Sequence, residues 1–177
     1  IGIYSLRNVR NRYGIKNLRF KLINSRKFIR YIKNNKVDLI ISIACPKMLK
    51  KSLLSAPKSG CINYHTSILP KFRGRQPLFW ALLKNEKEVG ISIHEMDRKL
   101  DNGAIIIQKR IPIEPFDSLD SLYKKTIKLG PKLIIKAISI IESSNYNRIE
   151  NNNNKATYYT FPTKKDREMF LKNGNRF

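Results

Sequence analysis

The 177-residue sequence predicts an α/β domain with a Rossmann-like, mostly parallel sheet and flanking helices. Segments with the apolar periodicity of strands alternate with segments that have the periodicity of helices, which is typical of this class. The run 37–44 is almost continuously apolar, as expected for a parallel strand that is covered on both faces. Hydrophobic residues make up 41% and charged residues 28% of the chain, which is ordinary for a globular domain.

Two predicted helices and a strand precede the run 37–44. Ser5 and Gly14 bound the first helix, as its N-cap and as the residue after its end. Residues 17–23 alternate apolar and basic side chains, which predicts a half-exposed strand. Ser25 is the expected N-cap of the second helix, whose apolar and basic side chains lie on opposite faces.

The alternation of strands and helices continues to about residue 144. The predicted elements are, in order, a short helix from Pro46 to Leu54, a strand after Gly60, a helix over 77–85, strands over 90–96 and 104–113, and a helix from Leu119 to about Ser143. From Asn145 the sequence is polar and rich in Asn. We therefore predict a folded domain over 1–144, followed by a polar linker and C-terminal tail over 145–177.

The charge of the chain is extreme and uneven. The formal net charge is +23, and residues 1–85 carry 19 Lys and Arg against one acid, Asp38. Such a surface attracts phosphate groups and non-specific nucleic acid at low salt. The general abundance of Lys, Ile and Asn explains the same charge without any ligand, so both interpretations stay open.

Composition also indicates where the protein works. No apolar run approaches the roughly 18 residues of a membrane span, so we expect no membrane contact. Cys45 and Cys61 have neither metal-type nor disulfide-type spacing. We interpret them as reduced thiols of a cytoplasmic protein.

Polar side chains interrupt the strand that follows Gly60. Asn63 and His65 are two residues apart and therefore share one face of that strand. Asp101 lies further along, in the turn "KLDNG". Ligands of open α/β sheets bind outside the carboxyl ends of strands, so we expect one crevice to be lined by the segments that follow residues 44, 62 and 96.

Several other kinds of site fit the sequence less well. His65 and His94 are the only histidines, and nearby carboxylates do not complete a metal-ligand set. Ser67 has no Gly-x-Ser-x-Gly elbow, and Cys61 has no visible activating group. An amide, an imidazole and a carboxylate together suit attack of an amine on an activated acyl group.

Each candidate also has an ordinary structural explanation. Taken singly, the amide, the imidazole and the carboxylate indicate strand capping, core polarity and a turn. His94 is expected to be a half-exposed strand residue rather than a ligand. Arg73 and Arg75, on either side of Gly74, fit a solvated loop and a phosphate clamp about equally well.

Two segments resemble the 10-formyltetrahydrofolate-dependent formyltransferases. They are "INYHTSILPKFRG" and "VGISIHEMDRKLDNGAIIIQKRIPI". The family patterns are Asn-x-His-x-Ser-Leu-Leu-Pro and, later, Met-Asp-x-x-Leu-Asp-x-Gly; Ile68 replaces one Leu. The resemblance runs from about Tyr13 to Phe161 and implies that 1–144 is a formyltransferase catalytic domain, in part.

The resemblance implies a role for each matching residue. Asn63 and His65 would bind the oxyanion of the tetrahedral intermediate. Asp101 would hold His65 charged and order a water that carries a proton from the attacking amine to the folate nitrogen. The co-substrate would be 10-formyltetrahydrofolate, without a metal. Its expected contacts are Lys47, Met48, Leu49, Met96, Asp97 and Arg98, and the expected substrate loop is Arg73 and Gly74.

The resemblance leaves the acceptor amine open. The segment after 146 is similar to the linker of methionyl-tRNA formyltransferases, and amino-sugar nucleotide formyltransferases share the same catalytic half. Family members also have a strand and a glycine turn before the region that matches Tyr13, so we expect an N-terminally incomplete fold with an exposed edge at Leu39–Ile43. A catalytically inactive, basic RNA-binding module and a formyltetrahydrofolate hydrolase are the alternatives.

Overall fold

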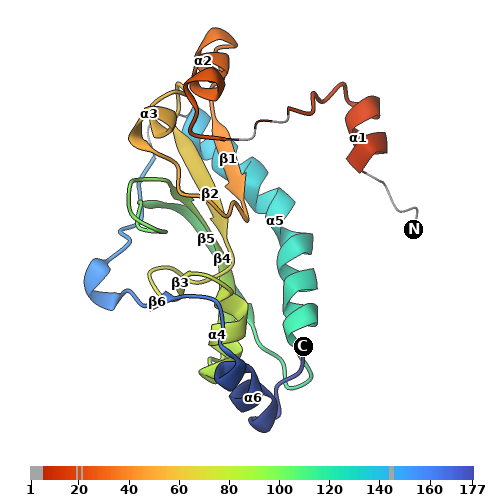
Figure 1. The fold of residues 1–177 in the computed structure, drawn as a ribbon. Helices are drawn as coiled ribbons and strands as arrows, with labels where there is room; N and C mark the ends of the chain where they lie inside the picture. The colour runs from red at the N-terminus through yellow and green to blue at the C-terminus, as the bar shows by residue number, and fades with distance from the viewer. Residues whose placement is uncertain (1–5, 19, 21, 144–145) are drawn as a thin grey trace.

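The computed structural model describes residues 6–18, 20, 22–143 and 146–177. Four of its strands form one sheet in the order β1-β2-β4-β5. The strands are β1 (Ile40–Ile43), β2 (Cys61–His65), β4 (Glu88–Glu95) and β5 (Ile105–Pro112). The long helix α5 (Leu119–Glu142) lies along one face of this sheet (Figure 1). The α/β prediction is therefore confirmed.

The direction of the strands differs from the prediction of a mostly parallel sheet. β1 and β2 are parallel, but β4 is antiparallel both to β2 and to β5. β4 and β5 are consecutive strands joined by the loop 96–104, and such a connection makes a hairpin rather than a crossover. The hydrophobic run that predicts a parallel strand belongs to β1, and it carries no information about the direction of β4.

The helices follow the capping signals in the sequence. Ser25 caps α2 (Arg26–Asn34) by accepting from the backbone of Phe28 (3.2 Å), as predicted. Ser118 caps α5 in a capping box with Ser121. The remaining helices of this part are α1 (Leu6–Arg12), α3 (Lys51–Leu54) and α4 (Pro77–Leu83).

Two predicted elements are wrong in part. The described residues of 17–23 lie in no strand. The helix expected over 46–54 is reduced to its last turn, because the Asn24 side chain holds 46–50 as a loop: it donates to the carbonyl of Met48 and accepts from the N–H of Lys50. The N-cap predicted at Ser5 lies outside the described residues.

The segment expected to be a linker and tail packs against the rest of the chain. β6 (Tyr158–Tyr159) pairs with β3 (Arg73–Gly74), and the 3-10 helix η1 (Asn153–Lys155) precedes it. α6 (Lys164–Lys172) buries Phe170, whose ring stacks on Phe79 with centroids 4.6 Å apart. The division between 144 and 145 stays a prediction.

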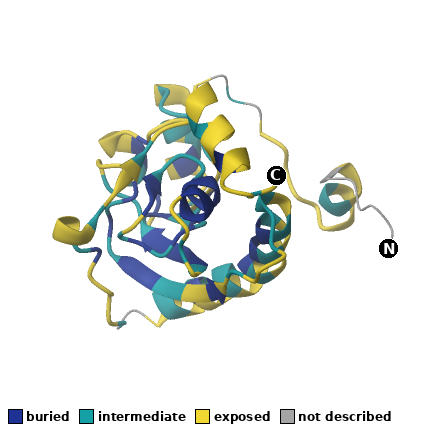
Figure 2. Ribbon diagram, turned by 90° about the horizontal axis from the view of Figure 1, so that it is seen from below, coloured by how far each residue is buried: buried dark blue, intermediate teal, exposed yellow. Residues whose placement is uncertain are grey.

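The main core lies between the sheet, α4 and α5. Figure 2 shows α4 buried along its whole length. α5 approaches β2 closely at Gly130, where an added Cβ would lie 2.9 Å from the ring of Tyr64. Within the described residues, β1 is an edge strand and Ile43 is 58% exposed, in line with the expected edge at 39–43. None of the helices in the described ranges is both long and apolar enough to cross a membrane.

Candidate active site

The predicted trio converges on the face of the sheet opposite α5. Asn63 and His65 alternate with Ile62 and Tyr64 along β2, and the hydroxyl of Tyr64 reaches α5 on the other face. Nδ2 of Asn63 donates to Oδ1 of Asp101 (3.2 Å). Nδ1 of His65 lies 3.7 Å from Oδ2 of the same carboxylate. A strand and a loop 38 residues apart in sequence are thus joined by one carboxylate.

Asp101 is buried and strongly held. Its backbone φ is +47°, in the left-handed region, and its Oδ2 accepts from the N–H of Gly74 (2.8 Å). Burial raises the pKa of Asp101, but contacts with His94, His65 and the Gly74 N–H outweigh burial and bring it to about 2. The side chain is therefore an acceptor-only carboxylate at neutral pH.

His65 has a defined tautomer. Its Nε2 lies 2.8 Å from the carbonyl oxygen of Phe72, and a carbonyl only accepts, so Nε2 carries a proton. Burial lowers the pKa of His65 below its ordinary value of 6.5, and this effect outweighs the field of Asp101. His65 is thus neutral at pH 7, whereas the resemblance implied a charged ring. Its Nδ1 is the nitrogen that faces Asp101 and is able to take up a proton.

His94 belongs to the same cluster, which the sequence did not indicate. It is the antiparallel neighbour of Asn63, and its Nε2 lies 3.3 Å from Nδ2 of Asn63 and 3.5 Å from Oδ1 of Asp101. Its Nδ1 donates to the carbonyl of Glu95 (2.7 Å). The expectation of a half-exposed His94 is wrong, since it is 2% exposed. Only the register of β2 against β4, which pairs Asn63 with His94, would have revealed that His94 belongs to this cluster.

The crevice is built differently from the one expected. The carboxyl ends of β1 and β2 do lie at the same edge, because these strands are parallel. The carboxyl end of β4 lies instead beside the start of β2, where the N–H of Met96 donates to the carbonyl of Cys61 (2.8 Å). The loop 97–101 then brings Asp101 back over Asn63.

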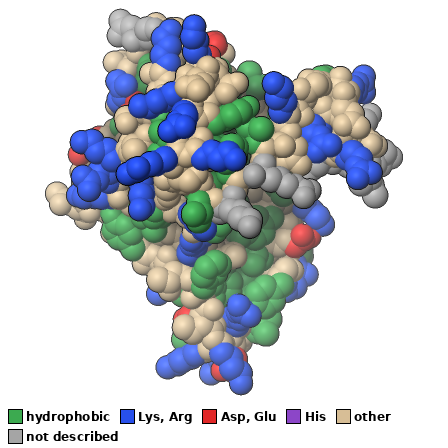
Figure 3. Space-filling view, turned by 45° about the horizontal axis from the view of Figure 1, so that its top comes forward, with side chains coloured by type: hydrophobic (Ala, Val, Ile, Leu, Met, Phe, Trp, Pro, Cys, Tyr) green, Lys and Arg blue, Asp and Glu red, His purple; other side chains and the backbone are tan. Residues whose placement is uncertain are grey.

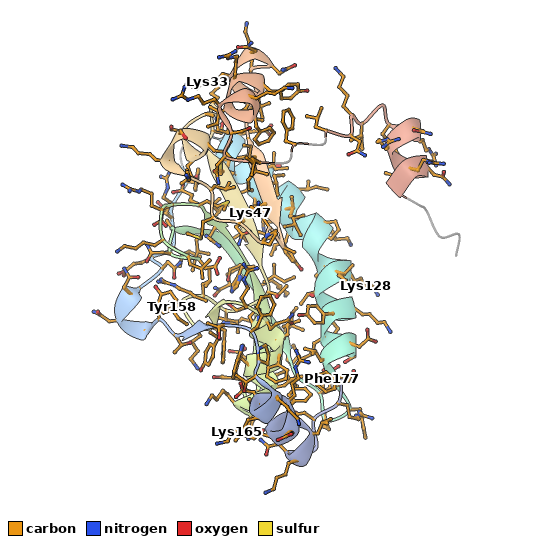
Figure 4. The ribbon with its side chains drawn as sticks, in the orientation of Figure 1. Lys33, Lys47, Lys128, Tyr158, Lys165 and Phe177 are labelled. Atoms are coloured by element: carbon orange, nitrogen blue, oxygen red, sulfur yellow. The ribbon has the colours of Figure 1, made fainter. Side chains whose placement is uncertain are left out.

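The two segments expected to contact the co-substrate lie together. Met96 packs on the small core of Leu49, Leu53 and Cys61. A cavity of about 760 Å³ lies beside this core. Its lining is Met48, Leu49, Lys50, Lys51, Ser52, Ser55 and Arg98. Lys47, labelled in Figure 4, is exposed on the loop after β1, and Asp97 accepts from Asn102 and from the N–H of Lys99.

Arg73 and Gly74 face the inside of the protein rather than solvent. Arg73 is 0% exposed, so it is neither a solvated loop residue nor an open phosphate clamp. Gly74 leaves no room for a side chain, since a Cβ would lie 2.2 Å from the carbonyl oxygen of Tyr159. Arg75 donates to the carbonyl of Pro46 (2.8 Å).

The structure does not support a thiol nucleophile, a serine nucleophile or a metal site among the described residues. Cys45 and Cys61 are free thiols, and burial raises the pKa of Cys61 to about 11, which suppresses its thiolate. Ser67 donates to the carbonyl of Lys71 (2.8 Å). No group of three or more His, Cys, Asp or Glu within the described ranges could hold a metal ion.

The sequence matches a known family over most of its length. Residues 9–138 match the family described as formyl transferase. The chain is 36% identical over 172 residues to a methionyl-tRNA formyltransferase of Kosmotoga olearia, covering 97% of this chain and 55% of the relative. It is 37% identical over 139 residues to the bifunctional polymyxin resistance protein ArnA of Wigglesworthia glossinidia brevipalpis, covering 78% and 21%. The chain thus spans about half the length of the methionyl-tRNA formyltransferases it matches.

Solved structures share the fold. The formyltransferase PseJ from Anoxybacillus kamchatkensis, in complex with UDP-4,6-dideoxy-4-formamido-L-AltNAc and tetrahydrofolate, matches with a TM-score of 0.73 and 24% identity over 95% of this chain and 86% of that one. The N-formyltransferase from Helicobacter canadensis, with folinic acid and dTDP-3-aminofucose, matches with a TM-score of 0.68 and 24% identity over 92% and 55%. At this identity the likeness supports the fold.

Proposed function

The chain belongs to the formyl transferase family, and we propose that its site transfers a formyl group from 10-formyltetrahydrofolate to a primary amine. The observation that carries the proposal is the convergence of Asn63, His65 and Asp101 in one buried cluster. The reaction forms a bond between the amine nitrogen and the formyl carbon and breaks the bond between that carbon and N10 of the folate. One proton moves from the amine to N10.

Negative charge develops on the formyl oxygen during this reaction. The amide of Asn63 is a suitable donor to this oxygen, because an amide N–H directed at a developing oxyanion contributes about 3 to 4 kcal/mol. In the structure its Nδ2 is directed at Asp101 and His94, so one of its N–H groups must turn toward the substrate. Once His65 is protonated, its Nδ1–H becomes a second hydrogen-bond donor for the formyl oxygen, because Nε2–H stays bonded to the carbonyl of Phe72.

The proton requires a carrier that is neutral at the start. His65 suits this role, because burial lowers its pKa and Nε2 already carries the proton bonded to Phe72. Nδ1 therefore receives the amine proton, directly or through a water ordered by Asp101, and returns it to N10. The carboxylate of Asp101 stabilises the imidazolium in between, at a separation of 3.7 Å.

The co-substrate proposal rests on the cavity beside Met48, Leu49 and Arg98. Solved structures of the same fold contain tetrahydrofolate and folinic acid, which supports a folate as the co-substrate of this chain. We assign the pterin to Lys47, Met48 and Leu49 together with Met96, Asp97 and Arg98.

We propose that the acceptor is a phosphate-bearing amine, either methionyl-tRNA or an amino-sugar nucleotide. The chain matches a methionyl-tRNA formyltransferase and also a formyltransferase solved with a sugar nucleotide. Figure 3 shows Lys and Arg gathered at the end of the molecule with α2 and α3. The exposed cations on α2 and on 47–58 are Arg26, Lys27, Arg30, Lys33, Lys47, Lys50, Lys51 and Lys58. Non-specific nucleic-acid binding that falls steeply with salt would accompany this surface. We propose the cytoplasm, where folate co-substrates and reduced thiols coexist, as the site of action.

The test supplies 10-formyltetrahydrofolate together with methionyl-tRNA, an amino-sugar nucleotide or glycinamide ribonucleotide. The chain is assayed as given and within the polypeptide that its complete reading frame encodes. We expect tetrahydrofolate release that depends on one acceptor and is lost in Asn63→Ala. Release of formate without any acceptor would instead indicate a hydrolase. Salt-sensitive RNA binding without release of tetrahydrofolate from the complete polypeptide would refute formyl transfer.

A further inference from the structure

A buried polar network lies behind Asp101, outside the proposed catalytic trio. Its centre is the pair Arg73 and Asn151, which are 0% and 7% exposed. One arm of the guanidinium donates to both the backbone oxygen (3.0 Å) and Oδ1 (2.6 Å) of Asn151. The pair lies where the β3 segment, the loop after β4 and the 151–158 segment meet.

Asn151 holds the backbone of the Asp101 loop. Its Nδ2 donates to the carbonyl oxygens of Asp101 (3.0 Å) and Gly103 (2.9 Å). Carbonyls only accept and the guanidinium only donates, so the orientation of this amide is fixed by its partners. The residue held in this way, Asp101, has a left-handed backbone, which is uncommon for a non-glycine residue although Asp adopts it more readily than most, so these contacts help to fix it.

Arg73 links the same loop to the segment after α5. Its other arm donates to Oδ1 of Asn102 (3.0 Å), to Oδ1 of Asn153 (2.8 Å) and to the hydroxyl of Tyr158, which Figure 4 labels. These partners are all neutral, and burying a cation among neutral groups is costly unless its hydrogen bonds are made. Within the described residues, Nε of this guanidinium is buried without a hydrogen-bond partner, so burial of the cation is not fully compensated and stability alone does not account for the network.

Gly74, the residue after Arg73, connects the network to the carboxylate itself. Its N–H donates to Oδ2 of Asp101 (2.8 Å), while Asn151 holds the backbone of Asp101 from the other side. We propose that Arg73 and Asn151 are positioning residues that hold the Asp101 carboxylate against Gly74 and His65. The geometry of this proposal stands on the contacts above, and its kinetic consequence rests on the proposed formyl transfer.

Asn151→Asp is the sharpest test. The new carboxylate still accepts from Arg73 and adds an opposite charge beside the guanidinium, so the fold should persist. It has no N–H, so two carbonyls lose their donor and face lone pairs instead. Asn154→Asp is the matched control, because the same change then falls on an exposed side chain of the same Asn run.

The first readout needs no catalysis. In ¹⁵N-labelled protein, the Gly74 amide should give a protected, downfield proton signal, because it is bonded to a carboxylate. We expect Asn151→Asp to move this signal upfield and to speed its exchange at least 10-fold, while Asn154→Asp leaves it unchanged. An unchanged Gly74 signal in a folded Asn151→Asp protein would overturn the proposal.

The second readout is kinetic and uses the complete polypeptide. We expect kcat of Asn151→Asp to fall by about 10- to 100-fold with unchanged KM for donor and acceptor, because a misplaced catalytic group slows only the chemical step. A wild-type kcat, or a change in KM alone, would overturn the proposal. If no protein shows transfer but the Gly74 signal responds as expected, the positioning stands and the proposed function fails.

Asn151→Ala covers the case in which the buried carboxylate prevents folding. It removes the same two donors without adding charge, and it should give the same changes in the Gly74 signal and in kcat. If both Asn151 variants unfold while Asn154→Asp folds normally, the network serves the fold alone and the positioning role is refuted.

Discussion

Replacing His94 with Leu should raise the pKa of Asp101. The side chain of His94 is buried, and its Nε2 lies 3.5 Å from Oδ1 of Asp101. Its contact with this carboxylate is the largest of the effects that lower the pKa, ahead of the field of His65 and the Gly74 N–H. Leu fills the site without a donor or a charge, so burial would then be opposed by fewer contacts.

The size of the effect follows from the wild-type value. The pKa of Asp101 falls from an ordinary 3.8 to about 2, and each pKa unit corresponds to about 1.4 kcal/mol, so the folded protein favours the carboxylate by roughly 2 kcal/mol. Because the folded pKa is depressed, this stabilisation is present above about pH 4 and is lost as the pH falls toward 2. Because His94 is the first of the effects that lower the pKa, its loss should move the Asp101 midpoint clearly upward from about 2.

The assay is an NMR titration of the ¹³C-labelled Asp carboxyl carbons in both proteins between pH 1.5 and 6. We expect an Asp101 midpoint near 2 in the wild type and a clearly higher one in His94→Leu, after circular dichroism has confirmed that the variant is folded. Asp117, whose carboxylate pairs with Lys125, is the internal control, and its lowered pKa should not differ between the two proteins. Equal Asp101 midpoints in the two proteins would refute the role assigned to His94.

Two further substitutions and one titration test other parts of the structure. Phe170→Ala should lower the free energy of unfolding, measured by urea denaturation, by about 3 to 5 kcal/mol, because the ring is fully buried. Met169→Ala, on the exposed face of α6, is the control and should change this free energy little. Gly74→Ala should lower Tm far more than Gly174→Ala. Both glycines have positive φ, but of the two only Gly74 would place its new Cβ within 3 Å of a backbone atom, the carbonyl oxygen of Tyr159. Equal losses of Tm would contradict this. His65 should titrate below pH 6.5 by ¹⁵N NMR, because burial lowers its pKa. The neutral ring should therefore contribute stability above pH 6.5, and this contribution should be lost as the pH falls below that value. A midpoint above 6.5 would exclude His65 as the proposed proton carrier.

Local signals in the sequence were sufficient for many elements. Ser25 and Ser118 start helices because a side-chain oxygen caps backbone N–H groups within three residues, which needs no knowledge of the rest of the fold. Asn63 and His65 were predicted on one face because side chains alternate along any strand. Asp101 was chosen as the carboxylate of a glycine-containing turn, and its role beside His65 was implied by the resemblance.

Features that depend on distant contacts were not predictable from local patterns. His94 looked like an outward strand residue, because its burial depends on the antiparallel register of β4 and on the loops that cover that face. The Asn run at 151–154 looked like compositional drift, yet Asn151 and Asn153 bind the guanidinium of Arg73. An Arg with no complementary acid nearby in sequence gave no sign that amides would be its partners.

Pre-steady-state release of tetrahydrofolate tests the central claim most directly. It would be measured with saturating 10-formyltetrahydrofolate and the acceptor that supports turnover, in the complete polypeptide and in its Asn63→Ala variant. Loss of one hydrogen bond to the oxyanion should slow the chemical step by about 10²- to 10³-fold, while binding of 10-formyltetrahydrofolate is retained. An Asn63→Ala protein that releases tetrahydrofolate at the wild-type rate would contradict a site in which this amide stabilises the developing oxyanion.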